Sequence, residues 1–154
     1  MSGKTQKSSS AIIYQSLSQM SKSFYEKFGD EVLPLIYKAW YAMGLELGKR
    51  LKERQVTTDF KSAALAVNNA LHKRYGTSLV CEELSKSVYH LKTKSGNVCD
   101  VGLENSGRPI CEAVMSVNQG RFKAACGIDV DMNIVKSRAI GDNCCEMIYR
   151  PLKK

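Results

Sequence analysis

CEAVMSVNQGRFKAACGIDVDMNIVKSRAIGDNCCEMIY, residues 111–149, is the stretch that decides the fold. Apolar side chains recur at steps of three and four in its first part, and this spacing predicts a helix over residues 109–126. The positions that share this face are Ile110, Val114, Val117, Arg121 and Ala125.

Two strands are expected after that helix, because the apolar period changes from helical spacing to alternation. The alternating residues are Val130, Met132 and Ile134, then Cys145, Met147 and Tyr149. An apolar residue out of phase at Val135 predicts a bulge near 134–135. Gly141-Asp142-Asn143 has the residue types of a tight turn, so we expect a C-terminal β-hairpin.

Three helices are predicted before this block. The first would bury a face at four positions, Ile13, Leu17, Met20 and Phe24. The second runs from Val32 to Leu51. The third has an apolar face from Phe60 to Leu71 and is expected to stop at Tyr75-Gly76. Within the second, Gly44 and Gly48 each cost about 1 kcal/mol relative to alanine. The pair therefore indicates close approach of either a second helix or a ligand.

Short segments rich in β-branched residues lie between the third and fourth helices, at residues 77–84, 87–94 and 97–104. They predict two or three strands of an antiparallel meander. The fold class is therefore α+β, with three N-terminal helices, a small antiparallel sheet, one further helix and the hairpin, packed as a two-layer helix/sheet domain. Residues 1–10 are expected to form a disordered lead and 11–154 a single domain.

Composition and charge argue against several classes of protein. The 154 residues are 44% hydrophobic and 25% charged, with a net charge of +8. No apolar run approaches the roughly 20 residues of a membrane span, and the N-terminus lacks the apolar core of a secretory signal, so we expect a cytoplasmic protein. The basic residues gather in the tails and in residues 48–54, at a helix end, and no nucleic-acid-binding motif accompanies them. We therefore expect no nucleic-acid partner.

The six cysteines form no CxxC pair and do not have zinc-finger spacing. Buried thiols acting as small hydrophobic groups are the simplest interpretation. The alternative is a spatial cluster of Cys99, Cys111 and Cys145 that acts as a metal site for zinc or another thiolate-bound metal, a redox switch or a nucleophile. Cys111 is the best single candidate because it opens a helix, whose dipole would lower the thiol pKa. Of Cys144 and Cys145, one should face the core near Cys111 or Cys99.

Three segments resemble known families. AMGLELGKRLKER, residues 42–54, and residues 111–149 resemble 4-vinyl reductase domains, whose superfamily includes haem-NO-binding domains and the small TRAPP vesicle-tethering subunits. The GDxCC ending is also similar to proteins like L-2-amino-thiazoline-4-carboxylic acid hydrolase. DFKSAALAVNNALHKRYG, residues 59–76, resembles the third helix of the TRAPP subunits.

The 4-vinyl reductase resemblance implies a sensor or carrier that binds a small apolar molecule such as a hydrocarbon, and a homodimer formed through helices. The ligand pocket would lie between the sheet and the glycine-bearing helices, with thiols at its rim. Its expected residues are Trp40, Met43, Gly44, Gly48, Met115 and Phe122.

The sequence also departs from these families. Ser137 stands where 4-vinyl reductase domains often have a cysteine, which weakens the metal site. Ser116 stands near where the hydrolase-like proteins have an aspartate. VTTDF, residues 56–60, lacks the cysteine that carries an acyl chain in a TRAPP subunit. Whether the protein is an enzyme therefore stays open. The two alternatives to a binding domain are a thiol-dependent hydrolase of a small cyclic substrate, with Cys111 as nucleophile, and a TRAPP-like scaffold subunit.

Overall fold

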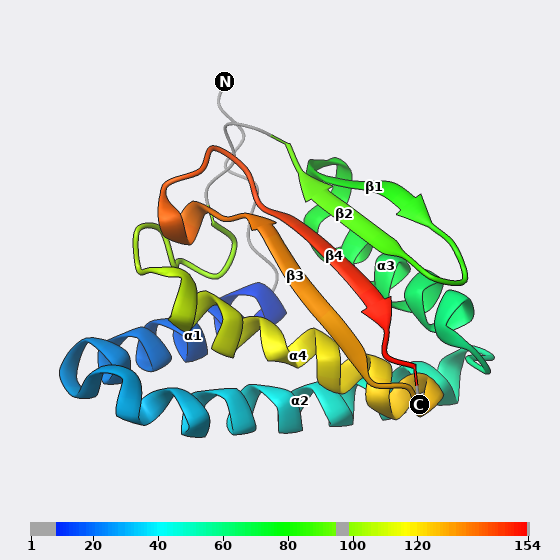
Figure 1. Cartoon of the computed structure of the whole chain (residues 1–154), viewed down its shortest axis with the longest axis horizontal. Helices are drawn as coiled ribbons and strands as arrows, with labels where there is room; N and C mark the ends of the chain where they lie inside the picture. Colours follow the sequence, from blue (N-terminus) through cyan, green and yellow to red (C-terminus); the bar gives the residue numbers. More distant parts are fainter. Residues whose placement is uncertain (1–8, 95–98, 154) are drawn as a thin grey trace.

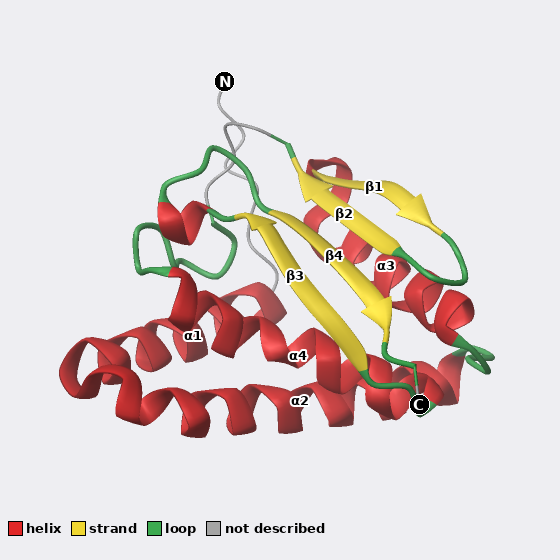
Figure 2. Cartoon of the chain, viewed as in Figure 1, coloured by secondary structure: helices red, strands yellow, loops and turns green. Residues whose placement is uncertain are grey.

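A computed structural model describes residues 9–94 and 99–153. Its helices are α1 Ser9–Phe28, α2 Leu33–Arg54, α3 Phe60–Tyr75 and α4 Arg108–Cys126, and its strands are β1 Leu79–Leu84, β2 Tyr89–Thr93, β3 Val130–Lys136 and β4 Glu146–Pro151. The predicted α+β class, helix order and C-terminal hairpin are confirmed (Figure 2). Of the predicted lead, residues 1–8 lie outside the described residues, while Ser9 and Ser10 belong to α1.

The four strands form one antiparallel sheet in the order β1-β2-β4-β3. Pairing of β2 with β4, for example Leu91 opposite Met147, joins the early and the late hairpins into a single sheet. The register between β3 and β4 shifts between Ile134 and Lys136, which confirms the predicted bulge.

One face of this sheet is buried and the other is more polar. Tyr89 and Leu91 on β2 and Met147 and Tyr149 on β4 all have exposed fractions of 6% or less. On the other face, His90 Nε2 lies 2.8 Å from Glu146 Oε1 on the neighbouring strand. The helices therefore cover one face only, as the alternation along β4 predicted.

Helix α4 lies between the sheet and α2 (Figure 1). Gly44 of α2 has no room for a Cβ, which would collide with the backbone carbonyl of Val117. Gly48 meets the carbonyl of Arg121 in the same way, and Gly120 of α4 meets that of Tyr41. Of the two explanations for the paired glycines, the structure shows the close approach of a second helix.

The buried face of α1 differs from the predicted one. Ile13, Met20 and Phe24 are 58%, 52% and 45% exposed, whereas Tyr14, Ser18 and Ser21 are buried. The prediction was wrong for these apolar residues because α1 turns inward a face on which Tyr14 and Ser21 have hydrogen-bond partners in other elements. Trp40 Nε1, for example, donates to Ser21 Oγ at 3.0 Å.

A third strand at 97–104 does not form in its described part, residues 99–104. The chain turns there instead: the Cys99 N–H donates to Glu104 Oε1 at 2.7 Å, and Gly102 has φ of +72°. Cys99, Val101 and Leu103 are nevertheless buried, so this loop contributes to the core. Residues 97 and 98 lie outside the described part of the chain.

The link between β3 and β4 is longer than the predicted tight turn at 141–143. It spans residues 137–145 and includes the short 3₁₀ segment Arg138–Ile140. Asp142 closes this loop by accepting a hydrogen bond from the Ser137 N–H to its Oδ2 at 2.8 Å. The prediction was wrong because buried Ser137 and Arg138 hold the loop against the fold.

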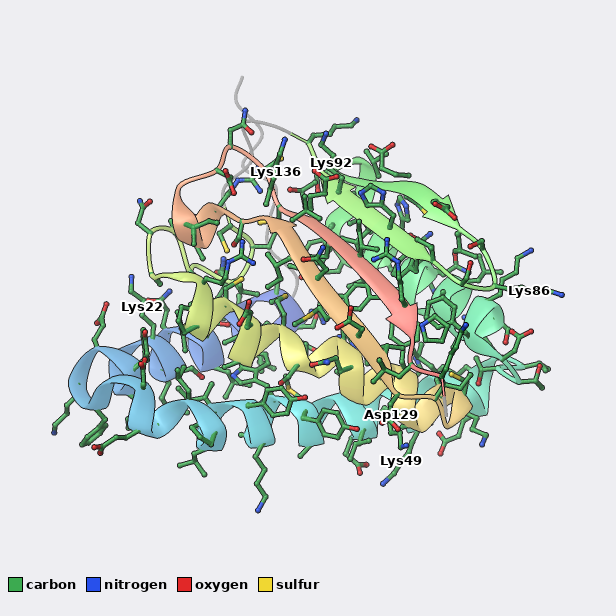
Figure 3. All side chains as sticks on the ribbon, in the orientation of Figure 1. Lys22, Lys49, Lys86, Lys92, Asp129 and Lys136 are labelled. Carbon is green, nitrogen blue, oxygen red and sulfur yellow. The ribbon has the colours of Figure 1, made fainter. Side chains whose placement is uncertain are left out.

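Surface charge is spread over the molecule. The labelled lysines of Figure 3 come from α1, α2, β2, β3 and the β1–β2 link; Lys92 and Lys136 lie near each other in this view, and the others lie at different edges of the molecule. Within the described residues, no helix combines the length and the apolar character needed to cross a bilayer.

Candidate ligand-binding cavity

A cavity of about 90 Å³ lies between α4, the buried face of the sheet, and parts of α1, α2 and α3. Its apolar walls include Trp40, Leu79, Leu91, Met115, Val117 and Met147. Its lining residues come from all four helices, from β1, β2 and β4 and from two loops, so no single element closes it. It has the general form of a small-molecule site, with mostly apolar walls and a few polar groups.

Two of the six residues predicted for ligand binding line this cavity, namely Trp40 and Met115. Gly44 and Gly48 pack against the α4 backbone instead. Met43 packs at the edge of the hydrophobic core, outside the cavity lining. Phe122 stacks on Phe60 with ring centroids 5.3 Å apart and thus belongs to an aromatic cluster beside the cavity.

Cys99, Cys111 and Cys145 all line the cavity, although they come from a loop, α4 and the loop before β4. The predicted proximity of a late cysteine to Cys111 and Cys99 is therefore present in the structure. All three are free thiols. However, among residues 9–94 and 99–153 no three His, Cys, Asp or Glu side chains are arranged to hold a metal ion. The geometry gives no support to the predicted metal site.

Cys111 is in the wrong environment for a reactive thiolate. Burial raises the pKa of its thiol to about 11, while a contact with Ser137 Oγ at 3.3 Å acts in the opposite direction. The expected lowering by the helix dipole is therefore wrong in direction, because loss of hydration outweighs it. Burial likewise raises the pKa of Cys99. A hydrolase that needs a Cys111 thiolate at neutral pH loses its main support.

Arg121 lies in the same cavity and is only 5% exposed. Its Nη1 donates to Asn118 Oδ1 at 3.1 Å and its Nη2 to the Tyr14 hydroxyl at 2.9 Å. Asn118 in turn donates to the Tyr149 hydroxyl at 2.8 Å. This network fixes the guanidinium between α1, α4 and β4 through neutral partners.

Arg138 is the second buried arginine of the lining, at 6% exposed. Its Nη1 donates to Thr93 Oγ1, and its Nη2 donates to the carbonyls of Lys94 and Asn143, each at 2.9 Å. These bonds tie the end of β2 to the loop before β4. Arg138 thereby holds Cys145 and Thr93 at the cavity wall.

Arg74 on α3 is the third arginine of the lining. Its guanidinium carbon lies 3.7 Å from the centre of the Tyr14 ring, a cation–π contact. Tyr14 therefore contacts two arginines, one through its ring and one through its hydroxyl. Asp100 is the one carboxylate among the cavity-lining residues.

No arginine was predicted for the site from the sequence. A signal was present for Arg121, because it falls in phase with the apolar face of the helix at 109–126, where a charged residue is rarely buried without a reason. Tyr14 and Arg138 had no such signal. Tyr14 neighbours the apolar residues expected to face the core, and Arg138 lies in an irregular loop.

Comparison with known proteins rests on structure, since no family model and no curated protein matches this sequence. The chain is similar to trafficking protein particle complex subunit 3 from Naegleria fowleri, solved covalently bound to palmitic acid, with a TM-score of 0.67, 13% identity and coverage of 94% of this chain and 95% of that one. The fold is shared. The phenol-responsive sensory domain of the transcription activator PoxR, solved with phenol, has a TM-score of 0.61 and 16% identity, covering 90% of this chain and 74% of that one.

Identities of 13% and 16% establish fold alone. Residue roles in the present cavity therefore rest on its own geometry.

Proposed function

We propose that this protein is a sensor or carrier domain of the 4-vinyl reductase type that binds a small, largely apolar molecule in the cavity beneath α4. The observation that carries the proposal is the cavity itself, with Trp40, Leu91, Met115 and Met147 in its walls. Two proteins of the same fold were solved with palmitic acid and with phenol, which supports a binding role for this architecture.

The size of the cavity limits the ligand. A cavity of about 150 Å³ lined by apolar side chains holds benzene, and the present one is about 90 Å³. Met115 and Met147 have flexible, unbranched side chains that can rearrange to enlarge it. A small ring or a short chain is therefore the expected occupant.

The test begins with native mass spectrometry of freshly purified protein and continues with calorimetric titration of phenol. Met115→Trp places a large ring in the cavity wall and should weaken phenol binding at least tenfold. Met43→Trp is the matched control, since Met43 is also partly buried but lies outside the lining. Trp40 is the only tryptophan, so its fluorescence reports binding to the wild-type protein directly.

Absence of both a co-purified molecule and phenol binding would contradict the proposal. Equal loss of affinity in the two methionine variants would also contradict it, because only one of them alters the cavity wall.

A second candidate function is assembly, and the exposed apolar residues of α1 favour it. Ile13, Met20 and Phe24 follow one another at steps of seven and four, so they share one helix face, and each is at least 45% exposed. A stripe of this kind on a helix is typical of a protein contact. We infer that a second copy of the chain packs on this face to form a homodimer.

Phe24→Glu should convert the protein to a monomer in analytical ultracentrifugation, with a change in unfolding free energy within about 0.5 kcal/mol because the site is on the surface. Leu65→Glu is the control, since Leu65 is 50% exposed on α3, away from this face. A wild-type protein that sediments as a monomer at high concentration would remove the homodimer.

A further inference from the structure

The charged groups of the cavity indicate which class of small molecule it binds. Arg74, Arg121 and Arg138 line it together with Asp100, a formal excess of two positive charges. Arg121 and Arg138 are more than nine-tenths buried. Among the ion pairs of residues 9–94 and 99–153, none involves either of them.

A buried charge without an opposite charge is costly, because the low-dielectric interior does not replace the hydration it loses. Arg138 reduces this cost with hydrogen bonds from both terminal nitrogens to fixed acceptors of two loops and β2. Its role is to hold the cavity wall in place.

Arg121 has fewer hydrogen-bond acceptors than Arg138. Its hydrogen bonds within the described chain go to two neutral acceptors, Asn118 Oδ1 and the Tyr14 hydroxyl. An arginine has five N–H donors in a planar fork that matches a carboxylate. The network therefore orients the guanidinium while leaving it capacity to donate to a ligand.

We propose that the cavity binds a small organic carboxylate, with the carboxylate on Arg121 and the hydrocarbon part against the apolar walls. This inference rests on the proposed function and specifies its ligand class. A carboxylate would offset the excess positive charge of the lining and can accept two parallel hydrogen bonds from the guanidinium fork. The volume of about 90 Å³ suits an acid of few carbons, such as isovalerate.

The experiment compares isovalerate with its neutral amide, isovaleramide, which has nearly the same shape. In calorimetric titrations of the full chain, isovalerate should bind at least tenfold more tightly than isovaleramide. Arg121→Gln should weaken isovalerate binding at least tenfold and change isovaleramide binding by less than threefold. Arg150→Gln, at an exposed position of β4, should leave both affinities unchanged.

Because Arg121 is buried, its replacement by glutamine could weaken binding through lost packing. Arg121→Lys is therefore the matched variant, since it keeps the charge and removes the planar fork. Circular dichroism melting establishes that each variant folds. We expect Arg121→Lys to bind isovalerate with an affinity between those of the wild type and Arg121→Gln. This order depends on the charge and the fork, and loss of packing alone would not produce it.

Four outcomes overturn the carboxylate assignment. One is equal affinity of the wild type for the acid and the amide, and another is an unchanged isovalerate affinity in folded Arg121→Lys and Arg121→Gln. The third is equal affinity for inorganic phosphate and isovalerate, which would indicate a general anion site. The fourth is the absence of isovalerate binding. If phenol binds or a small molecule co-purifies, only the carboxylate assignment fails; if neither is observed, the proposed function fails as well.

Discussion

The two sides of α4 are built in opposite ways. Toward α2, Gly44, Gly48 and Gly120 bring the two helix backbones together so closely that no Cβ fits. Toward the sheet, the same helix leaves a cavity and places Cys111, Asn118 and Arg121 along it. One side is packed without space, and the other keeps space and polar groups.

The side of α4 that faces α2 contributes to the stability of the fold, and the side that faces the sheet contributes to the candidate binding site. Close backbone packing against α2 holds α4 in place as one wall of the cavity, and the sheet forms the opposite wall. Polar groups that would destabilise an ordinary core are tolerated on the cavity side because each is fixed by a neighbour, as Asn118 is by Tyr149. Substitutions on the α2 side should therefore mainly lower the unfolding free energy, and substitutions on the sheet side should mainly change the properties of the cavity.

The largest effect is expected on the packed side. Gly44→Ala should lower the unfolding free energy by about 3 kcal/mol, because the new Cβ collides with the backbone of Val117. A loss of that size corresponds to a drop of roughly 10 °C in Tm for a chain of this length, measurable by differential scanning calorimetry.

Helix propensity predicts the reverse sign for this substitution, since alanine exceeds glycine by about 1 kcal/mol. Ala42→Gly, at an exposed position of the same helix, is the propensity control and should lower stability by about that amount. A Gly44→Ala variant more stable than the wild type would disprove the close packing.

A smaller effect tests whether the cavity side excludes water. Burial raises the pKa of the Cys111 thiol from 9.0 to about 11, so the folded state favours the neutral thiol. The stability this contributes is fully present below pH 9 and is lost as the pH rises toward 11, a decrease on the order of 2–3 kcal/mol.

Cys111→Ala removes that loss, so its unfolding free energy, measured in urea from pH 8 to 11, should fall less steeply than that of the wild type. Buried Tyr89 and Tyr149, whose pKa values are also raised by burial, are present in both proteins and cancel in the comparison. Parallel pH curves would mean that water reaches Cys111 and that the cavity side is not dry.

Much of the local structure was predictable from the sequence. The helix expected at 109–126 is observed at Arg108–Cys126, and the bulge expected near 134–135 falls between Ile134 and Lys136. Both follow from the period with which side chains alternate between core and solvent, which neighbouring residues determine. The face of α1 was not predictable in this way, because its buried Ser21 and Tyr14 are stabilised by Trp40 and Arg121, which lie far along the chain.

In the candidate site, too, some residues were predictable from the sequence while their neighbours in space were not. Trp40 and Met115 were expected from the resemblance to 4-vinyl reductase domains and the three cysteines from their residue type, and all five line one cavity. Gly44 and Gly48 were correctly identified as unusual, yet sequence spacing could not distinguish a helix from a ligand as the neighbour.

The sequence by itself determined where the four helices and the strands of the two hairpins form, since periodic burial acts over a few positions. Only the tertiary structure decided that β2 pairs with β4, that α1 presents its apolar residues outward, and that a cavity with buried arginines remains beneath α4. The physical reason is distance along the chain. Tyr14 and Arg121 are 107 residues apart, and their hydrogen bond exists only once every element between them has packed.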